Sequence, residues 1–179
     1  MTLHVATFTQ LSPATLYALL RLRVDVFVVE QRCPYPELDG RDTEPETRHV
    51  WLADDDTPVA YLRALAEPDG AVRVGRVCVA VPARGRGLAG RLMAHALDLA
   101  GTRACVLDAQ SYLTGFYAGL GFTPTGPEYV DEDGIPHIPM HRPPDPVGPG
   151  PARDDAAQER ATRGSAQGRA ATSSAIERR

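Results

Sequence analysis

Between residues 71 and 100, a run of alternating valines is followed by a loop rich in glycine and arginine and then by an amphipathic segment. The first part, AVRVGRVCVAV (71–81), is typical of a strand, and the last part, GRLMAHALDLA (90–100), is typical of a helix. The loop between them, PARGRG (82–87), holds two arginines and two glycines. A strand that enters a helix in this way is the first half of a β–α–β unit, so we expect a pair of parallel strands.

The same loop has the residues of an anion-binding site. The first backbone N–H groups of a helix have no intrahelical partner, and the helix dipole adds positive charge at the same point. Gly85, Gly87 and Gly90 allow a ligand to approach the backbone closely. Arg84 and Arg86 can add charge-assisted hydrogen bonds. The loop is therefore expected to bind a phosphate or pyrophosphate group, with a plain surface turn as the alternative.

Hydrophobic spacing and turn residues place this unit in a longer series of elements. Ser12 and Pro13 mark the start of a helix over 12–31, and a short helix is expected over 112–120. Further strands, the last two forming a hairpin, are expected at 3–8, 49–54, 58–67, 102–109, 121–130 and 135–142. The order predicts an α/β fold whose mixed sheet has three consecutive antiparallel strands before the β–α–β unit and helices on its faces.

Segment 33–47, CPYPELDGRDTEPET, is acidic and contains three prolines. It is long for a plain connection, and long ordered loops are often functional. We therefore expect this loop to lie near the site. Acidic residues close to a binding cleft would favour a cationic ligand.

The character of the chain changes at Pro143. Residues 143–179 contain no aromatic residue, and Val147 and Ile176 are the only aliphatic side chains larger than alanine. Such a segment cannot bury enough apolar surface to offset its ordering entropy. We expect one domain over 1–142, followed by a Pro/Gly linker and a disordered tail.

The whole-chain composition argues against several classes of partner. The net charge of −4 does not favour a nucleic-acid binder. No apolar run approaches the roughly 20 residues that cross a membrane, and the N-terminus lacks a signal-peptide pattern. Three cysteines without a CxxC pair fit reduced thiols. We expect a cytoplasmic protein that binds neither nucleic acid nor membrane.

Two motifs resemble those of the GNAT superfamily of N-acetyltransferases. RGRGLA (84–89) fits the signature Arg/Gln-x-x-Gly-x-Gly/Ala, and AQSYLTGFYAGLGF (109–122) resembles Asn-x-x-Ala-x-x-x-Tyr-x-x-x-Gly-Phe. Gln110 and Leu113 replace the usual Asn and Ala of the second motif. The segments 16–52, 75–79 and 131–140 resemble the ElaA-type branch of the superfamily, so that the resemblance covers about residues 3–142.

The resemblance implies a GNAT fold, a twisted and mostly antiparallel sheet in which the strands 71–81 and 103–109 splay apart. It implies acetyl-CoA as the cosubstrate, with the pantetheine arm along the free edge of the first of these strands, where a bulge usually helps. It implies a small-molecule or peptide amine as the acceptor, and it leaves a homodimer open. The cofactor-binding residues implied in this way are Val77, Cys78, Val79, Arg84, Gly85, Arg86, Gly87, Leu88, Ala89, Gly90, Gln110 and Tyr117.

Tyr117 matches the tyrosine that acts as general acid in the family, and the alternative is that it only packs against the sheet. The base that accepts the proton of the amine has four candidates. They are Glu30, Asp39, Asp42 and His49. Cys105 stands at the position where some GNAT enzymes carry a glutamate base.

His137 and His141 are four residues apart but lie on a strand interrupted by prolines, so no metal site is expected. The leading hypothesis is an acetyl-CoA-dependent N-acetyltransferase. The alternative is a catalytically silent CoA-binding protein of the same fold that acts as a sensor or interaction module. The replacements at Gln110 and Leu113 favour the alternative, and the retention of Tyr117 favours the enzyme.

Overall fold

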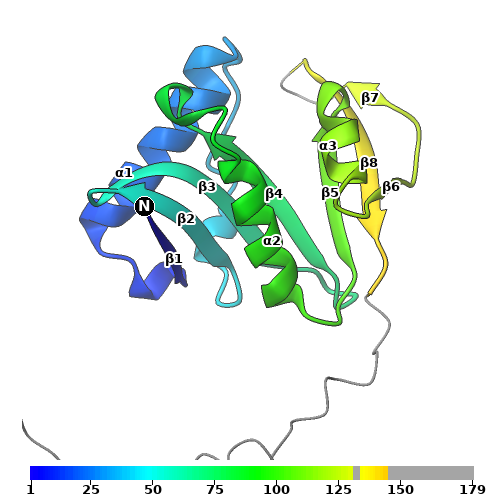
Figure 1. Ribbon diagram of the computed structural model, residues 1–179, viewed down its shortest axis with the longest axis horizontal. Helices are drawn as coiled ribbons and strands as arrows, with labels where there is room; N and C mark the ends of the chain where they lie inside the picture. Colours follow the sequence, from blue (N-terminus) through cyan, green and yellow to red (C-terminus); the bar gives the residue numbers. More distant parts are fainter. Residues whose placement is uncertain (131–133, 145–179) are drawn as a thin grey trace, which may run out of the picture. The chain divides into compact units, whose positions relative to one another are not determined.

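The computed structural model describes residues 1–130 and 134–144. The expected tail therefore lies almost entirely outside the described residues. Within the described part, the expected α/β order is confirmed, and helices flank a mixed sheet (Figure 1).

In the described ranges the sheet has the strand order β1-β2-β3-β4-β5-β8-β6, and β7 pairs with β8. The pairing of β4 with β5 is parallel and the other pairings are antiparallel, which confirms the mostly antiparallel mixed sheet. The strands are β1 (Thr2–Ala6), β2 (Arg48–Asp54), β3 (Thr57–Ala66), β4 (Val72–Val79), β5 (Cys105–Gln110), β6 (Thr123–Pro124), β7 (Tyr129–Val130) and β8 (Pro136–Arg142).

The helices are α1 (Pro13–Val24), α2 (Leu88–Ala100) and α3 (Thr114–Ala118). Ser12 caps α1 as expected, because its side chain accepts a hydrogen bond of 3.0 Å from the N–H of Thr15. The helix expected over 12–31 changes character after Val24 and continues as a π-helical turn (Asp25–Glu30). Such π turns often occur at functional sites.

The two long helices, α1 and α2, pack on opposite faces of the sheet. Successive side chains of each strand point to opposite faces, so that one strand contributes to both helix-packed cores. Tyr61 of β3 packs with Leu19 of α1 in one buried cluster. The next residue, Leu62, belongs with Leu92 and Met93 of α2 to the other cluster. Because side chains alternate between faces along a strand, β2, β3 and β4 contribute to both cores.

The strands β4 and β5 pair only at Val72–Cys105 and Arg73–Val106. Beyond Arg73 they diverge, as Figure 1 shows, and β4 continues to Val79 with its β5-facing edge unpaired in the described sheet. A bulge interrupts the pairing of β4 with β3, and at this bulge Arg76 adopts a left-handed φ of 54°. The splayed strands and the bulge expected from the family resemblance are therefore both present.

The strand expected over 121–130 is instead broken into the two short strands β6 and β7, each paired with β8. Pro124 and Pro127 have no N–H and cannot continue the ladder. Between them, the N–H of Thr125 donates to the carbonyl of Pro139 over 2.9 Å. In the described ranges no helix combines the length and the apolar character needed to cross a membrane.

Candidate active site

Two cavities meet at the gap between β4 and β5. The glycine-loop cavity, about 510 Å³, lies between the π turn, the exposed edge of β4, the start of α2, and α3. The arginine cavity, about 350 Å³, lies between loop 33–47, β3, β4, β5 and β8. Both are lined by Phe27, Val77, Gln110, Leu113 and Tyr117. A ligand in one cavity can therefore contact a ligand in the other.

The glycine loop presents backbone to its cavity. Gly85 and Gly87 have left-handed φ values of 75° and 70°, a conformation that favours glycine. Gly87 is also the residue that precedes the first turn of α2. A Cβ atom built on Gly85, Gly87 or Gly90 meets no other atom within 4 Å, so the space over the backbone is open. With the free N–H groups at the start of α2, this geometry suits an anion.

Arg84 ties the glycine loop to the π turn. Its Nη1 and Nη2 donate to the two carboxylate oxygens of Glu30, each over 2.7 Å, and its Nε donates to the carbonyl of Val79 over 3.1 Å. The hydrogen bonds from Arg84 lower the pKa of Glu30. Glu30, a candidate base in the sequence, therefore lies on the glycine-loop side as half of an ion pair, which does not suit a base.

Arg86 lies apart from the glycine-loop cavity. Its side chain is half exposed, and its Nη1 is 3.9 Å from a carboxylate oxygen of Asp54. The other loop residues expected to bind the cofactor do line the cavity. They are Arg84, Gly85, Gly87, Leu88, Ala89 and Gly90.

The free edge of β4 forms one wall of the glycine-loop cavity through Val77, Cys78 and Val79. Cys78 is buried beneath this wall, and burial raises the pKa of its thiol to about 12. A strand edge without a partner presents backbone N–H and C=O groups to an extended ligand. This edge suits a pantetheine arm, which carries two amides.

Tyr117 lies on α3, where the two cavities meet. It is 6% exposed, and burial raises the pKa of its phenol to about 12. The ring packs edge-on against Phe122 with centroids 6.1 Å apart. Among the described residues, the hydroxyl of Tyr117 has no hydrogen-bond partner, so it is available to a ligand.

Gln110 ends β5 at the same junction. Its side-chain amide lies 3.5 Å from that of Gln31, and its oxygen accepts a hydrogen bond of 2.5 Å from the hydroxyl of Tyr112. The amide pair joins the π turn to β5 across the gap between the splayed strands. Gln110 thus lies beside both cavities.

His49 does not reach either cavity. It is 1% exposed, and its ring nitrogens lie 2.8 Å from the hydroxyl of Tyr61 and 3.1 Å from the carbonyl of Asp42. Burial lowers the pKa of the ring. The side chain of His49 points from β2 to the underside of loop 33–47, where both ring nitrogens have partners within the protein. His49 therefore does not suit the role of base.

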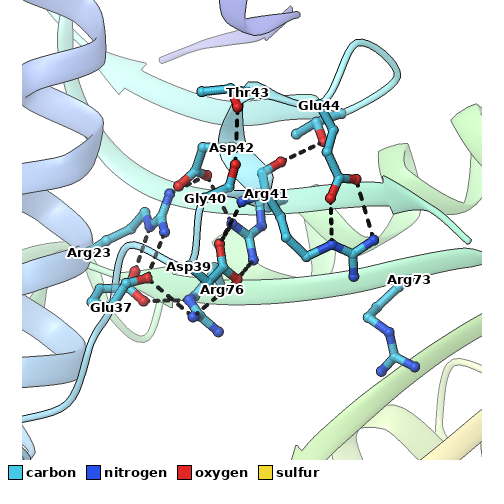
Figure 2. Close-up of polar contacts among 12 residues, drawn as sticks. Arg23, Glu37, Asp39, Gly40, Arg41, Asp42, Thr43, Glu44, Arg73 and Arg76 are labelled. Atoms are coloured by element: carbon cyan, nitrogen blue, oxygen red, sulfur yellow. Dashed lines mark hydrogen bonds and ion pairs between the residues drawn. The ribbon is translucent and has the colours of Figure 1, made fainter.

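Loop 33–47 is held to the sheet by ion pairs with arginines of three elements (Figure 2). Arg23 of α1 is fully buried and contacts Glu37 over 2.5 Å and Asp42 over 2.6 Å. Arg76 of β4 contacts Glu37 and, at 3.5 Å, Asp39. The acidic loop expected to attract a cationic substrate is therefore neutralised by the chain itself.

The two aspartates considered as bases belong to this network. Asp42 contacts both Arg23 and Arg63. Burial by itself would raise the pKa of Asp39, but hydrogen bonds and charge from Arg63, together with the charge of Arg76, hold it at about 2. A carboxylate held this firmly in its ionised form is a weak base.

The arginine cavity contains groups that the sequence did not assign to the acceptor side. Charged and polar side chains from five elements gather there: Tyr35, Arg41, Arg63, Arg73, Asp108 and His137. The Nδ1 of His137 donates to the carbonyl of Ile135 over 2.8 Å, which places the lone pair of the neutral ring on Nε2. Gln110 and His137 are direct partners in the β5–β8 ladder, a pairing that no sequence pattern revealed.

His137 and His141 were considered as metal ligands in the sequence. Throughout the described ranges, no group of three or more His, Cys, Asp or Glu side chains is arranged to hold a metal ion.

Comparison with known proteins yields consistent matches. A family model described as "Acetyltransferase (GNAT) domain" matches residues 22–142. The UPF0039 protein Rv2851c of Mycobacterium tuberculosis is 53% identical over 137 residues, which are 74% of this chain and 87% of that protein. Protein ElaA of Escherichia coli K12 is 42% identical over 140 residues, 75% of this chain and 91% of that protein.

Among solved structures, an acyl-CoA N-acyltransferase from Pseudomonas aeruginosa superimposes with a TM-score of 0.75 at 39% identity, over 79% of this chain and 99% of that one. An aminoglycoside 6'-N-acetyltransferase complexed with coenzyme A shares the fold with a TM-score of 0.60 at 15% identity, over 78% of this chain and 96% of that one.

Proposed function

Because the chain belongs to the GNAT acetyltransferase family, we propose that it transfers an acetyl group from acetyl-CoA to a primary amine, with Tyr117 as general acid. The observation that carries this proposal is the meeting of the two cavities at Tyr117. The glycine-loop cavity takes the donor, and the arginine cavity takes a small-molecule or peptide acceptor. A cytoplasmic location belongs to the same proposal.

The choice of acetyl-CoA rests on the two walls of the glycine-loop cavity. The glycine loop and the first turn of α2 offer backbone N–H groups to a pyrophosphate. The free edge of β4 at Val77 and Val79 offers hydrogen bonds to the pantetheine amides. Arg84 helps indirectly, since its ion pair with Glu30 fixes the loop against the π turn.

Tyr117 is the proposed proton donor to the leaving thiolate. A thiol in water has a pKa of about 8.5, well below that of the buried phenol. The leaving sulfur, however, would lie in the same apolar surroundings. The thiol of Cys78, which lines the same cavity, has its pKa raised to about 12 by burial. Apolar surroundings therefore narrow the gap between the pKa of the phenol and that of the leaving thiol, which favours proton transfer to the thiolate.

His137 is the proposed base. It lines the arginine cavity, and Gln110, its partner in the β5–β8 ladder, lines both cavities. Asp39, by contrast, is paired with Arg63. Replacing His137 with Gln should lower the turnover number about 100-fold while the calorimetric affinity for acetyl-CoA stays unchanged. An unchanged turnover number would exclude His137.

The decisive experiment is Tyr117→Phe, which removes one hydroxyl and keeps the ring. Release of CoA thiol is measured with a panel of amines and, without amine, as slow hydrolysis of acetyl-CoA. The turnover number should fall about 100-fold while the calorimetric affinity for acetyl-CoA stays unchanged. Tyr17→Phe, which removes the same hydroxyl from a 73% exposed ring of α1 outside both cavities, serves as the control.

A Phe variant with wild-type turnover would remove Tyr117 from the mechanism. Wild-type protein that binds acetyl-CoA but transfers to no amine would favour the alternative, a CoA-binding sensor or interaction module of the same fold.

A further inference from the structure

The arginine cavity is lined by more cationic than anionic side chains. Four guanidinium groups reach it, and two carboxylates do so. The cationic residues are Arg41, Arg63, Arg73 and Arg76, and the anionic ones are Asp39 and Asp108. Their other acidic partners, Glu37, Asp42, Glu44 and Glu67, do not line the cavity. The arginines therefore stand between these acids and the space that a substrate would occupy.

The bulge in β4 places two of these arginines on one face of the sheet. Residues three apart on a regular strand face opposite sides. Before the bulge, Val72 and Val74 belong to the α2 core, which leaves Arg73 on the α1 face. After the bulge, Cys78 belongs to the α1 core, so the alternation has shifted by one residue. Arg76, at the bulge, then lines the same cavity as Arg73.

Both arginines keep hydrogen-bond donors for a ligand. The Nε and Nη1 of Arg73 donate to Glu67 and Asp108 over 2.8 Å and 2.6 Å. The Nε and Nη2 of Arg76 contact loop 33–47. Among the described residues, Nη2 of Arg73 and Nη1 of Arg76 have no partner. The buried Nε of Arg63, in the same cavity, also has none.

From these observations we propose that the acceptor is an amine that also carries a carboxylate, and that Arg73 and Arg76 bind this carboxylate. The inference rests on the proposed function, since it names the acceptor class of the arginine cavity. Two guanidinium donors facing one space suit the two oxygens of a carboxylate. A cavity of about 350 Å³ matches a molecule between an amino acid and a short peptide in size.

A cationic lining also assists the chemistry. The amine must lose a proton before it attacks the thioester. Nearby guanidinium groups disfavour the ammonium form and lower the pKa of the acceptor amine. The same guanidinium groups repel a cationic amine, and the carboxylate of the acceptor offsets this repulsion when the acceptor binds. A diamine without a carboxylate lacks this attraction, so its binding is disfavoured.

The first test compares products as ligands and needs no turnover. Calorimetry on the CoA-loaded protein measures the affinities for three acids: N-acetyl-L-alanine, N-acetyl-L-leucine and Nε-acetyl-L-lysine. The affinity for each acid is compared with the affinity for its carboxamide, in which an amide replaces the carboxylate. At least one acid should bind ten times more tightly than its amide. Equal binding of every acid and amide pair would overturn the inference.

The second test assigns the preference to residues. Arg73→Gln and Arg76→Gln should each reduce the ratio of acid to amide affinity at least fivefold, while the affinity for CoA stays unchanged. Arg21→Gln, at a 74% exposed side chain of α1, is the matched control and should leave the ratio unchanged. Arg73 is half-buried, so its variant is expected to fold, and melting curves verify this. A ratio retained in both folded variants would overturn the assignment.

The two proposals fail in different ways. Turnover on amines without any preference for a carboxylate would preserve the proposed function and refute this inference. A preference for acids in the absence of turnover would preserve the carboxylate site at Arg73 and Arg76 and refute the enzymatic proposal.

Discussion

The glycine-loop cavity and the arginine cavity share Tyr117 but are built in different ways. The first is formed by consecutive backbone from Ala83 to Gly90 and by the free edge of β4, with mostly apolar side chains around them. The second is formed by long charged side chains from β3, β4, β5 and loop 33–47, which are held in place by ion pairs with one another and with Arg23 of α1. Backbone geometry defines one cavity, and an electrostatic network defines the other.

This difference suits the two proposed ligands. A cofactor with a constant pyrophosphate and pantetheine can be bound by groups that every residue possesses, provided the chain has the right conformation. An acceptor must be distinguished from other amines, which requires specific side chains. The following changes test whether one cavity can be altered without the other.

The largest effect is expected from Arg23→Met. Arg23 is fully buried, and its removal leaves Glu37 and Asp42 without their main counter-charge. Breaking a buried ion pair from one side costs about 3–5 kcal/mol. Urea denaturation should show this loss in the free energy of unfolding. Arg21→Met, an exposed position on the same helix, should change it by less than about 0.5 kcal/mol. A loss below about 1 kcal/mol for Arg23→Met would mean that the network does not hold loop 33–47.

Gly87→Val tests the glycine-loop cavity. It places a β-branched side chain at a φ of 70° and into the space above the loop. The affinity for acetyl-CoA should fall at least tenfold, about 1.4 kcal/mol. Gly70→Val is the matched control, because Gly70 has a φ of 87° and equally open surroundings, but lies in a turn outside both cavities. The control should share the loss of stability and keep the affinity. Equal affinities of wild type and a folded Gly87→Val protein would refute the pyrophosphate site.

A smaller effect is expected from acid acting on Asp39. Its pKa in the folded protein is about 2, below the ordinary value near 4. The stability it contributes is therefore complete above pH 4 and is lost as the pH falls from 4 to 2. Because the side chain is partly exposed, we expect about 1 kcal/mol. Thermal unfolding from pH 5 to 2 should show a shallower decline in Asp39→Asn than in wild type. Parallel curves for the two proteins would contradict the pairing of Asp39 with Arg63.

The smallest effect is expected from deletion of residues 146–179. The segment has almost no apolar side chain to bury. The melting temperature and the affinity for acetyl-CoA should stay nearly unchanged, because the segment is not expected to contribute to the domain or to either cavity. A clear fall in the melting temperature would show that the tail stabilises the domain.

Much of the glycine-loop cavity was predictable because its determinants are local. Valine alternation, the glycines of the loop and the amphipathic segment at 88–100 each act within a few residues, and together they fix a strand, a turn and a helix in order. The position of Tyr117 followed from motif spacing on the next β–α pair. Even here, sequence alone could not show that Arg84 pairs with Glu30, which lies 54 residues earlier.

The arginine cavity was decided by the tertiary structure. The chain has 19 arginines and no lysine, so no single arginine stands out in the sequence. The bulge that shifts the alternation of β4 at Arg76, and the β5–β8 register that sets His137 beside Gln110, leave no periodic trace in the chain. The sequence determined the elements and the backbone cradle, because local conformation depends on neighbouring residues. The tertiary structure alone decided which distant charges meet, because an ion pair depends on distance in space and not on separation along the chain.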